Sequence, residues 1–232
     1  MSGGLRGVLF DMDGLLVDSE PLWFEAERSV MARMGGTWSQ ADQGQLVGGS
    51  LPNSVGYMLA RAARPAEPAQ VGTWLLDTMA ALIAERGVPL MPGAAELLAD
   101  VAAAGVPRAL VTSAERRIMD AVLASTGLVF GVTVCAEDVS RGKPDAEPYL
   151  RAAALLGEPP ARCVALEDSP RGVASATAAG CTVIAVPSMP GVPIPAGTAG
   201  PGRPGPVVVA SLREVDLARL RQLVVASCAR GA

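Results

Sequence analysis

Residues 8–14 read Val-Leu-Phe-Asp-Met-Asp-Gly, an apolar run that ends abruptly in two carboxylates separated by one residue. The run predicts a buried strand over residues 5–10. Alternate side chains of an extended segment point the same way, so Asp11 and Asp13 would both project beyond the strand's carboxyl end. Open parallel sheets bind ligands at that edge. The alternative is a plain turn, in which short acidic residues and Gly14 only reverse the chain.

Composition limits the classes of protein to which this chain can belong. Its 232 residues allow one large domain, or a main domain with a smaller insert. A net charge of -4 gives no reason to expect nucleic acid or an anionic membrane as a partner. No apolar run reaches the ~18 residues of a membrane span, and Asp11 and Asp13 interrupt the only apolar stretch near the N-terminus, unlike a secretory signal. We therefore expect a cytoplasmic protein that binds neither membranes nor nucleic acids. A monomer or weak dimer is expected as well, although composition does not decide the oligomeric state.

The cysteines give a second indication of compartment. They are widely spaced and form no Cys-x-x-Cys pair, and three of them lie in apolar, strand-like runs. This pattern predicts buried thiols of a cytoplasmic protein. The four residues are Cys135, Cys163, Cys181 and Cys228.

The chain contains no histidine, and Lys143 is the single lysine among its 19 basic residues. Without histidine, proton transfer and metal binding must fall to carboxylates and other oxygen donors. Oxygen ligands favour a hard cation such as Mg2+. A compact ammonium also fits a tight polar site where a planar guanidinium would not. Lys143 is therefore a candidate functional residue, with an arbitrary surface lysine as the alternative.

Strand and helix patterns divide the chain into two parts. Residues 18–87 show helical patterns with no convincing strand between them. From residue 88 onward strands and helices alternate, which implies right-handed crossovers and a parallel sheet. A Pro/Gly-rich stretch, 187–206, is expected to be a surface loop. The predicted strands after the first are 108–111, 132–135, 163–166, 182–186 and 207–209. The predicted helices are 20–34, 53–63, 69–86, 93–104, 115–125, 146–156, 171–179 and 212–226.

The most economical architecture is a Rossmann-like three-layer α/β/α parallel sheet core with an inserted α-helical cap domain. The core would comprise residues 1–17 and 88–232, and the cap residues 18–87. An insert at a strand's carboxyl end would overhang the ligand site. The cap contains all three tryptophans. Packing within a small helical bundle explains them, and a substrate-facing role for one or two is the alternative.

Polar side chains follow four of the predicted strands, at the edge of the sheet where they would converge. Each could instead have a purely structural role. Thr112 or Ser113 could cap the next helix, and residues 168–170 (Asp-Ser-Pro) are typical of the start of a helix. Together they supply two catalytic carboxylates, a hydroxyl donor, a cation and acidic metal ligands. The set is Asp11, Asp13, Thr112, Ser113, Lys143, Glu167 and Asp168.

These groups meet the demands of phosphoryl transfer, in which catalysis is mainly positioning and electrostatic stabilisation. Phosphate would repel an aspartate nucleophile unless cations screened it, as Mg2+ and the Lys143 ammonium would do. An aspartyl-phosphate intermediate divides one difficult displacement into two steps. Asp13 could protonate the leaving oxygen and later deprotonate the attacking water.

Four segments resemble, as a set, the motifs of the haloacid dehalogenase superfamily, and they occur in the family's order across nearly the whole chain. The segments are 11–20 (Asp-Met-Asp-Gly-Leu-Leu-Val-Asp-Ser-Glu), 110–113 (Leu-Val-Thr-Ser), 141–145 (Arg-Gly-Lys-Pro-Asp) and 166–172 (Leu-Glu-Asp-Ser-Pro-Arg-Gly). The resemblance implies Asp11 as nucleophile, Asp13 as acid/base and Lys143 as charge stabiliser. The implied phosphate ligands are Thr112, Ser113 and Lys143. The implied Mg2+ ligands are Asp11, the backbone carbonyl of Asp13, and Asp168, with Glu167 assisting.

The insert resembles the helical cap of the β-phosphoglucomutase and sugar-phosphatase branch. Residues 18–23 (Asp-Ser-Glu-Pro-Leu-Trp) are similar to those of bacterial sugar- and polyol-phosphate phosphatases. The mutases carry a cap histidine where Trp23 aligns, and an arginine that grips a second phosphate where Leu51 aligns. The phosphonate-cleaving relatives need a cap lysine, which this chain lacks. The resemblance therefore favours a phosphatase.

The resulting hypothesis is a Mg2+-dependent phosphomonoesterase that hydrolyses a small phosphorylated metabolite, a sugar or polyol phosphate, through an aspartyl-phosphate. A β-phosphoglucomutase-like phosphomutase is the alternative among enzymes. A receiver-like signalling module would also combine an acidic Mg2+ pocket with Asp, Thr/Ser and Lys, but it would be a shorter chain without a cap. Arg116 is either a substrate contact or a residue of a solvated helix face.

Overall fold

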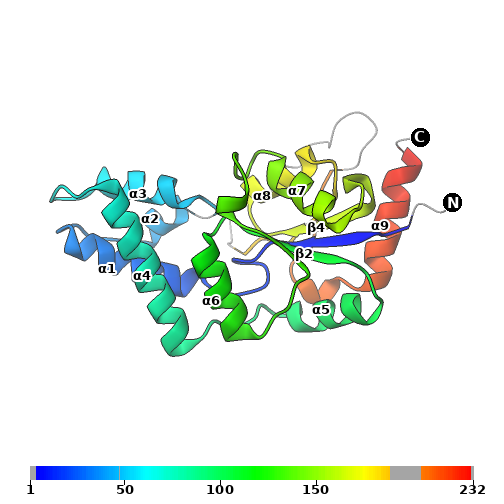
Figure 1. Ribbon diagram of the computed structural model, residues 1–232, viewed down its shortest axis with the longest axis horizontal. Helices are drawn as coiled ribbons and strands as arrows, with labels where there is room; N and C mark the ends of the chain where they lie inside the picture. The colour runs from blue at the N-terminus through cyan, green and yellow to red at the C-terminus, as the bar shows by residue number, and fades with distance from the viewer. Residues whose placement is uncertain (1–3, 47, 189–204, 231–232) are drawn as a thin grey trace.

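The computed structural model describes residues 4–46, 48–188 and 205–230, with the side chains of 228–230 excepted. Two lobes are visible in Figure 1, one built on a β-sheet and one made of helices. Most of the predicted surface loop at 187–206 and the side chain of Cys228 lie outside the described residues.

A six-stranded parallel sheet forms the centre of the larger lobe, with strand order β3-β2-β1-β4-β5-β6. β1 lies between β2 and β4, and Phe10 pairs with both Leu110 and Leu166. The three strands therefore end at the same level, and the residues that follow them meet at one edge. The strands are β1 (Gly7–Phe10), β2 (Arg108–Val111), β3 (Val132–Val134), β4 (Cys163–Glu167), β5 (Thr182–Ala185) and β6 (Val207–Val208).

Helices cover both faces of the sheet, which confirms the predicted three-layer arrangement. Val8 and Phe10 of β1 face the layer that contains α5, α6 and α9, whereas Leu9 faces α7 and α8. Figure 1 shows α7 and α8 above the sheet and α5 and α6 below it. The helices are α5 (Ala94–Ala103), α6 (Arg116–Thr126), α7 (Glu147–Leu156), α8 (Pro170–Ala178) and α9 (Leu217–Arg230), with short 3-10 helices η1 (Ala136–Asp138), η2 (Pro160–Arg162) and η3 (Leu212–Glu214).

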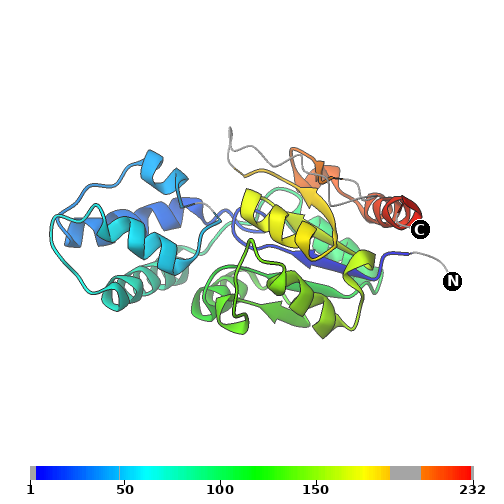
Figure 2. The same ribbon diagram turned by 90° about the horizontal axis from the view of Figure 1, so that it is seen from above.

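The remaining helices form the cap, which has an apolar core of its own. They are α1 (Glu20–Arg33), α2 (Gln40–Gly44), α3 (Leu51–Leu59) and α4 (Pro68–Arg86). Figure 2 shows them together at one end of the molecule, beyond the carboxyl ends of the strands. The chain leaves and re-enters the sheet lobe side by side, because Val17 pairs with Leu90 in an isolated antiparallel bridge. The exact cap bounds, 18 and 87, remain a prediction.

The cap core settles the role of one tryptophan. Trp38 is buried with apolar residues of α1, α3 and α4, and its ring packs edge-on against Tyr57 at a centroid distance of 5.8 Å. Packing therefore explains Trp38. Trp23, by contrast, lines the pocket described below.

Three helical segments differ from the sequence prediction. The helix predicted over 53–63 is α3, which spans Leu51–Leu59. The five-residue helix α2 is too short for periodicity to reveal, and the capping box between Ser39 and Asp42 stabilises its first turn. The single helix predicted over 212–226 is instead the 3-10 turn η3 followed by α9, which starts at Leu217.

The cysteine prediction holds for the three side chains that the structure describes, since Cys135, Cys163 and Cys181 are all buried. Among the described helices, none has both the length and the apolar character that a membrane crossing requires.

Two glycines that flank α5 allow a test of how tightly η3 is packed. Gly93 has φ +92°, and a Cβ there would lie 2.5 Å from the backbone nitrogen of Arg213 in η3. Gly105 has φ +65°, but a Cβ there would meet nothing within 4 Å. We expect Gly93→Ala to lower the free energy of unfolding by ~2–4 kcal/mol and Gly105→Ala by only ~1 kcal/mol, measured by urea denaturation. Equal losses would show that η3 moves away from the added methyl group.

Candidate active site

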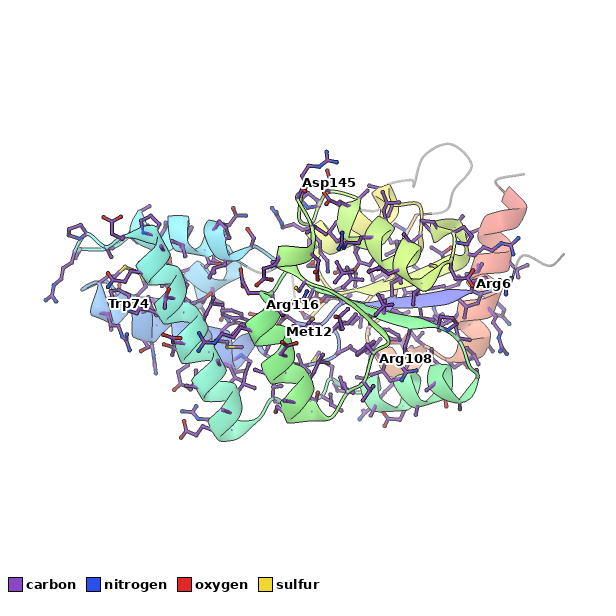
Figure 3. All side chains as sticks on the ribbon, viewed as in Figure 1. Arg6, Met12, Trp74, Arg108, Arg116 and Asp145 are labelled. Carbon is purple, nitrogen blue, oxygen red and sulfur yellow. The ribbon has the colours of Figure 1, made fainter. Side chains whose placement is uncertain are left out.

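The candidate site is a pocket between the cap and the carboxyl edge of the sheet. Figure 3 labels Met12, which separates the two aspartates, near the junction of the two lobes. Six of the seven residues predicted from the sequence line this pocket: Asp11, Asp13, Thr112, Ser113, Lys143 and Asp168. The seventh, Glu167, is completely buried behind it and contacts Lys143.

Lys143 connects three strands at the floor of the pocket. Its Nζ donates hydrogen bonds to Asp11 Oδ1 at 2.5 Å, to Glu167 Oε1 at 2.5 Å and to the backbone oxygen of Val111 at 2.9 Å. All three ammonium protons therefore have acceptors. Burial opposes the charge, but the carboxylates of Asp11 and Glu167 outweigh it and raise the pKa of Lys143. The lysine is a buried cation, and the surface-lysine alternative is wrong.

Glu167 anchors this ammonium from behind. Its Oε1 also accepts a hydrogen bond from the Tyr149 hydroxyl at 2.6 Å. Its Oε2 accepts from the backbone nitrogens of Asp168 and Ser169 and from the Ser169 hydroxyl, at 3.2 to 3.4 Å. Both carboxylate oxygens thus already have protein donors. Tyr149 was missed in the sequence, because nothing in its spacing shows that α7 turns this phenol toward β4.

The negative charge in the site exceeds the positive charge. Ligand oxygens of Asp11, Glu167 and Asp168 lie within 4.8 Å of one another, beside the single ammonium of Lys143. Burial, and then the charge of Glu167, raises the pKa of Asp11 well above its usual range and that of Asp168 to about 8. An additional cation would stabilise the ionised carboxylates. Hard oxygen donors in this number fit Mg2+.

Asp13 has a different environment, suited to proton transfer. Its Oδ1 accepts hydrogen bonds from the Ser19 hydroxyl at 2.5 Å and from Trp23 Nε1 at 3.4 Å. Burial raises the pKa of Asp13, and these hydrogen bonds only partly offset the effect. A carboxyl group with a raised pKa keeps its proton to a higher pH than usual and can give that proton to a reacting oxygen.

The turn proposed as the alternative for this segment is also present. Gly14 has φ +78°, and a Cβ there would overlap the carboxylate of Asp168. Only glycine fits, so the turn brings the segment after β1 against the residue that follows β4. Turn formation and site formation are therefore two aspects of one structure.

Of the helix-capping roles suggested as alternatives, the one for Thr112 or Ser113 is wrong and the one for residues 168–170 is confirmed. The N-cap of α6 is Glu115, so neither Thr112 nor Ser113 caps that helix. The Thr112 hydroxyl is instead buried at the end of β2 and accepts a hydrogen bond from the backbone nitrogen of Ala114 at 3.0 Å. Ser169 does cap α8, by accepting from the backbone nitrogen of Gly172 at 3.1 Å. That cap places Asp168 at the pocket.

The cap supplies the opposite wall of the pocket. Of its lining residues, sequence reasoning singled out only Trp23 and Leu51; it missed Glu20, Glu27, Gln43 and Ser54. Burial raises the pKa of Glu20 and of Glu27 to about 7. The faces of the cap helices that meet the sheet lobe depend on tertiary packing, so the sequence carries no direct signal for these residues.

Arg116 takes no part in the pocket wall. It lies at the start of α6, labelled in Figure 3, and its Nη2 forms an ion pair with Asp138 Oδ2 at 2.5 Å. Its side chain is 44% exposed. The structure thus favours the solvated-helix interpretation.

Comparison with known proteins agrees with this geometry. The model of the haloacid dehalogenase-like hydrolase family matches residues 5–180, more than half of the chain. The chain belongs to this family. It is an enzyme of the hydrolase class.

Named relatives resemble this hydrolase over most of their length. Hexitol phosphatase A of Escherichia coli (strain K12) is 39% identical over 182 residues, covering 78% of this chain and 82% of that protein. Protein CbbY of Rhodobacter capsulatus is 34% identical over 195 residues, covering 79% and 86%. A crystal structure of a mutant of CbbY from Rhodobacter sphaeroides, in complex with xylulose-(1,5)bisphosphate, superposes with a TM-score of 0.83 at 26% identity, covering 94% of this chain and 99% of that chain.

The buried carboxyl group of Glu27 predicts a pH-dependent stability of the hydrolase. Burial raises the pKa from 4.5 to about 7, while the hydrogen bond from Trp38 lowers it in part. The protonated Glu27 side chain therefore makes its full contribution to the free energy of unfolding below about pH 4.5, and this contribution is lost as the pH rises through 7. Glu27→Gln cannot ionise, yet its amide oxygen can still accept from Trp38. Between pH 5 and pH 8 we expect the free energy of unfolding to fall less in this variant than in the parent protein. The difference between the two decreases should be up to ~3 kcal/mol.

Urea denaturation followed by tryptophan fluorescence at both pH values measures this difference. Glu85→Gln, at a side chain 70% exposed near the end of α4, controls for the loss of one charge. An identical pH dependence in Glu27→Gln and the parent protein would contradict the prediction.

Proposed function

We propose that this hydrolase is a Mg2+-dependent phosphomonoesterase that acts on a small sugar or polyol phosphate through an aspartyl-phosphate intermediate. The observation that carries the proposal is the Lys143 ammonium, held between Asp11 and Glu167 in a pocket that also contains Asp13 and Thr112. The similarity to Hexitol phosphatase A supports the substrate class.

The first step transfers the phosphoryl group to Asp11. Because Asp11 Oδ1 is held by Lys143, its Oδ2 is the oxygen available to attack phosphorus. The new O–P bond forms as the bond from phosphorus to the leaving oxygen breaks, and Asp13 gives its proton to that oxygen. Thr112 and Ser113 supply hydroxyl groups to the phosphate oxygens. The products are a free alcohol and phospho-Asp11.

The second step releases phosphate. Asp13, now ionised, takes a proton from a water molecule as the water oxygen attacks phosphorus. The bond between phosphorus and Asp11 Oδ2 breaks, which restores the free carboxylate, whose Oδ1 is still held by Lys143. The protonation of both aspartates at the end equals that at the start, so the cycle is closed.

The metal would be held by Asp11, Asp168 and the backbone carbonyl of Asp13. Glu167 would assist from behind, since donors from the protein already occupy both of its oxygens. When bound, Mg2+ supplies positive charge that offsets the negative charge of the phosphate and the nucleophile.

The alternatives have less support. Trp23 and Leu51 line the pocket at the two places where the sequence aligns with the histidine and arginine of the mutases. The family match over residues 5–180 and the inserted helices argue against a receiver-like module.

A cytoplasmic location and a monomeric or weakly dimeric state stay predictions from the sequence.

The test is a phosphate-release screen over sugar, polyol and nucleotide monophosphates, with p-nitrophenyl phosphate as a generic substrate. We expect Mg2+-dependent release that chelation abolishes. Asp11→Asn should lower kcat at least ~1,000-fold, because the nucleophile is lost while the side-chain shape is kept. Asp100→Asn, on the exposed face of α5, is the matched control and should keep full activity. Turnover by Asp11→Asn would contradict the mechanism.

A second prediction concerns the buried phenol behind the site. Tyr149→Phe keeps the ring beside Lys143 but removes a hydrogen-bond donor from Glu167. We expect kcat for p-nitrophenyl phosphate to fall about tenfold with little change in KM, because Lys143 is held less firmly against Asp11. Tyr57→Phe removes a comparable hydrogen bond to Asp42 in the cap and is the control. Equal kcat values for the two variants would refute a supporting role for Tyr149.

A further inference from the structure

The half of the pocket that faces the leaving group is acidic. Glu20 and Glu27 of α1 line it, together with Glu115 just before α6. Among the residues that the structure describes, Lys143 is the only basic side chain in the wall, and Asp11 and Glu167 already hold its ammonium. A second phosphate group on a substrate would therefore meet carboxyl groups and no available cation.

Glu20 and Glu27 are fixed in place, and each keeps one oxygen for a ligand. Gln43 Nε2 donates to Glu20 Oε2 at 2.9 Å, and Trp38 Nε1 donates to Glu27 Oε2 at 2.9 Å. Within the described chain, neither Oε1 atom has a protein donor. The residue Glu27 is only 4% exposed and lines the pocket, so the pocket is where a ligand would meet its carboxyl group.

The two acceptors are spaced along one face of α1. Glu20 and Glu27 are seven residues apart on α1, which places them on one face about 10 Å apart along the helix axis. Two hydroxyl groups at different positions of one molecule could donate to them. Gln43 and Ser54 add neutral polar groups to the same wall.

The names and ligands of the relatives differ in the same respect. The crystal structure of CbbY from Rhodobacter sphaeroides is in complex with a bisphosphate, whereas another relative is named for hexitol phosphates. In this chain, an apolar side chain, Leu51, also lines the pocket.

We infer that the pocket selects monophosphates whose leaving group is polyhydroxylated and carries no negative charge, with Glu20 and Glu27 as the residues that bind its hydroxyl groups and repel a second anionic group. The inference rests on the proposed phosphatase function. It adds to that function the charge of the leaving group that the pocket accepts, and it names the two residues that select for this charge.

The test compares two substrates with the same carbon skeleton, a hexitol 6-phosphate and the corresponding hexitol 1,6-bisphosphate, at pH 8, where Glu20 and Glu27 with their pKa of about 7 are mostly ionised. For the parent enzyme we expect kcat/KM to favour the monophosphate by at least ~100-fold. In the double variant Glu20→Gln/Glu27→Gln this ratio should fall about tenfold or more, mainly through KM, because the charged acceptors and the repulsion are both lost. Glu85→Gln is the matched control and should leave the ratio unchanged.

A gain-of-function variant makes the test independent of the folding of the double variant. Leu51→Arg places a cation in the pocket wall and should raise kcat/KM for the bisphosphate about tenfold. Equal use of both substrates by the parent enzyme would overturn the inference. A double variant that loses both substrates by the same factor would show that the two glutamates are only structural, which also overturns it. If the parent enzyme fails even on p-nitrophenyl phosphate, the proposed function itself is wrong and the inference falls with it.

Discussion

Lys143 holds together the part of the molecule on which everything else depends. Its buried ammonium bonds to the residue after β1, to the last carbonyl of β2 and to the last residue of β4. Buried charges are costly unless they are paired and fully hydrogen-bonded, and removal of one partner leaves an uncompensated charge. The three hydrogen bonds of this one side chain thus fix the distances between the ends of β1, β2 and β4. Glu167 and Tyr149 extend the coupling into the helical layer behind the sheet.

The same interaction explains the electrostatic division of the pocket. Because one ammonium faces three buried carboxylates, the floor has the ligands for a further cation and, with it, for a phosphate group. The cap contributes the opposite character, with two more carboxyl groups and no basic side chain in the described wall. A ligand that satisfies both halves has one anionic end and one hydroxyl-rich end. The sheet and the cap therefore differ in charge in the way that their different roles in binding require.

Most of the site could be predicted from the sequence because parallel strands present their following residues at one edge. Once Asp11, Thr112 and Asp168 were each assigned to a strand end, their convergence followed from the sheet alone. β2 has the predicted bounds because its apolar run is short and clearly flanked. Helix α2 could not be found, because five residues stabilised by a local capping box leave no periodic pattern.

The sequence by itself determined the alternation of strands and helices, the inserted helical segment and seven candidate site residues, six of which line the pocket while Glu167 lies behind it. These are local patterns, or consequences of strand direction. Only the tertiary structure decided that Glu20 and Glu27 face the pocket and that Tyr149 supports Glu167. The physical reason is that the rotation of a helix about its axis is set by the neighbours against which it packs. Those neighbours, α4 for α1 and the sheet for α7, are distant in sequence.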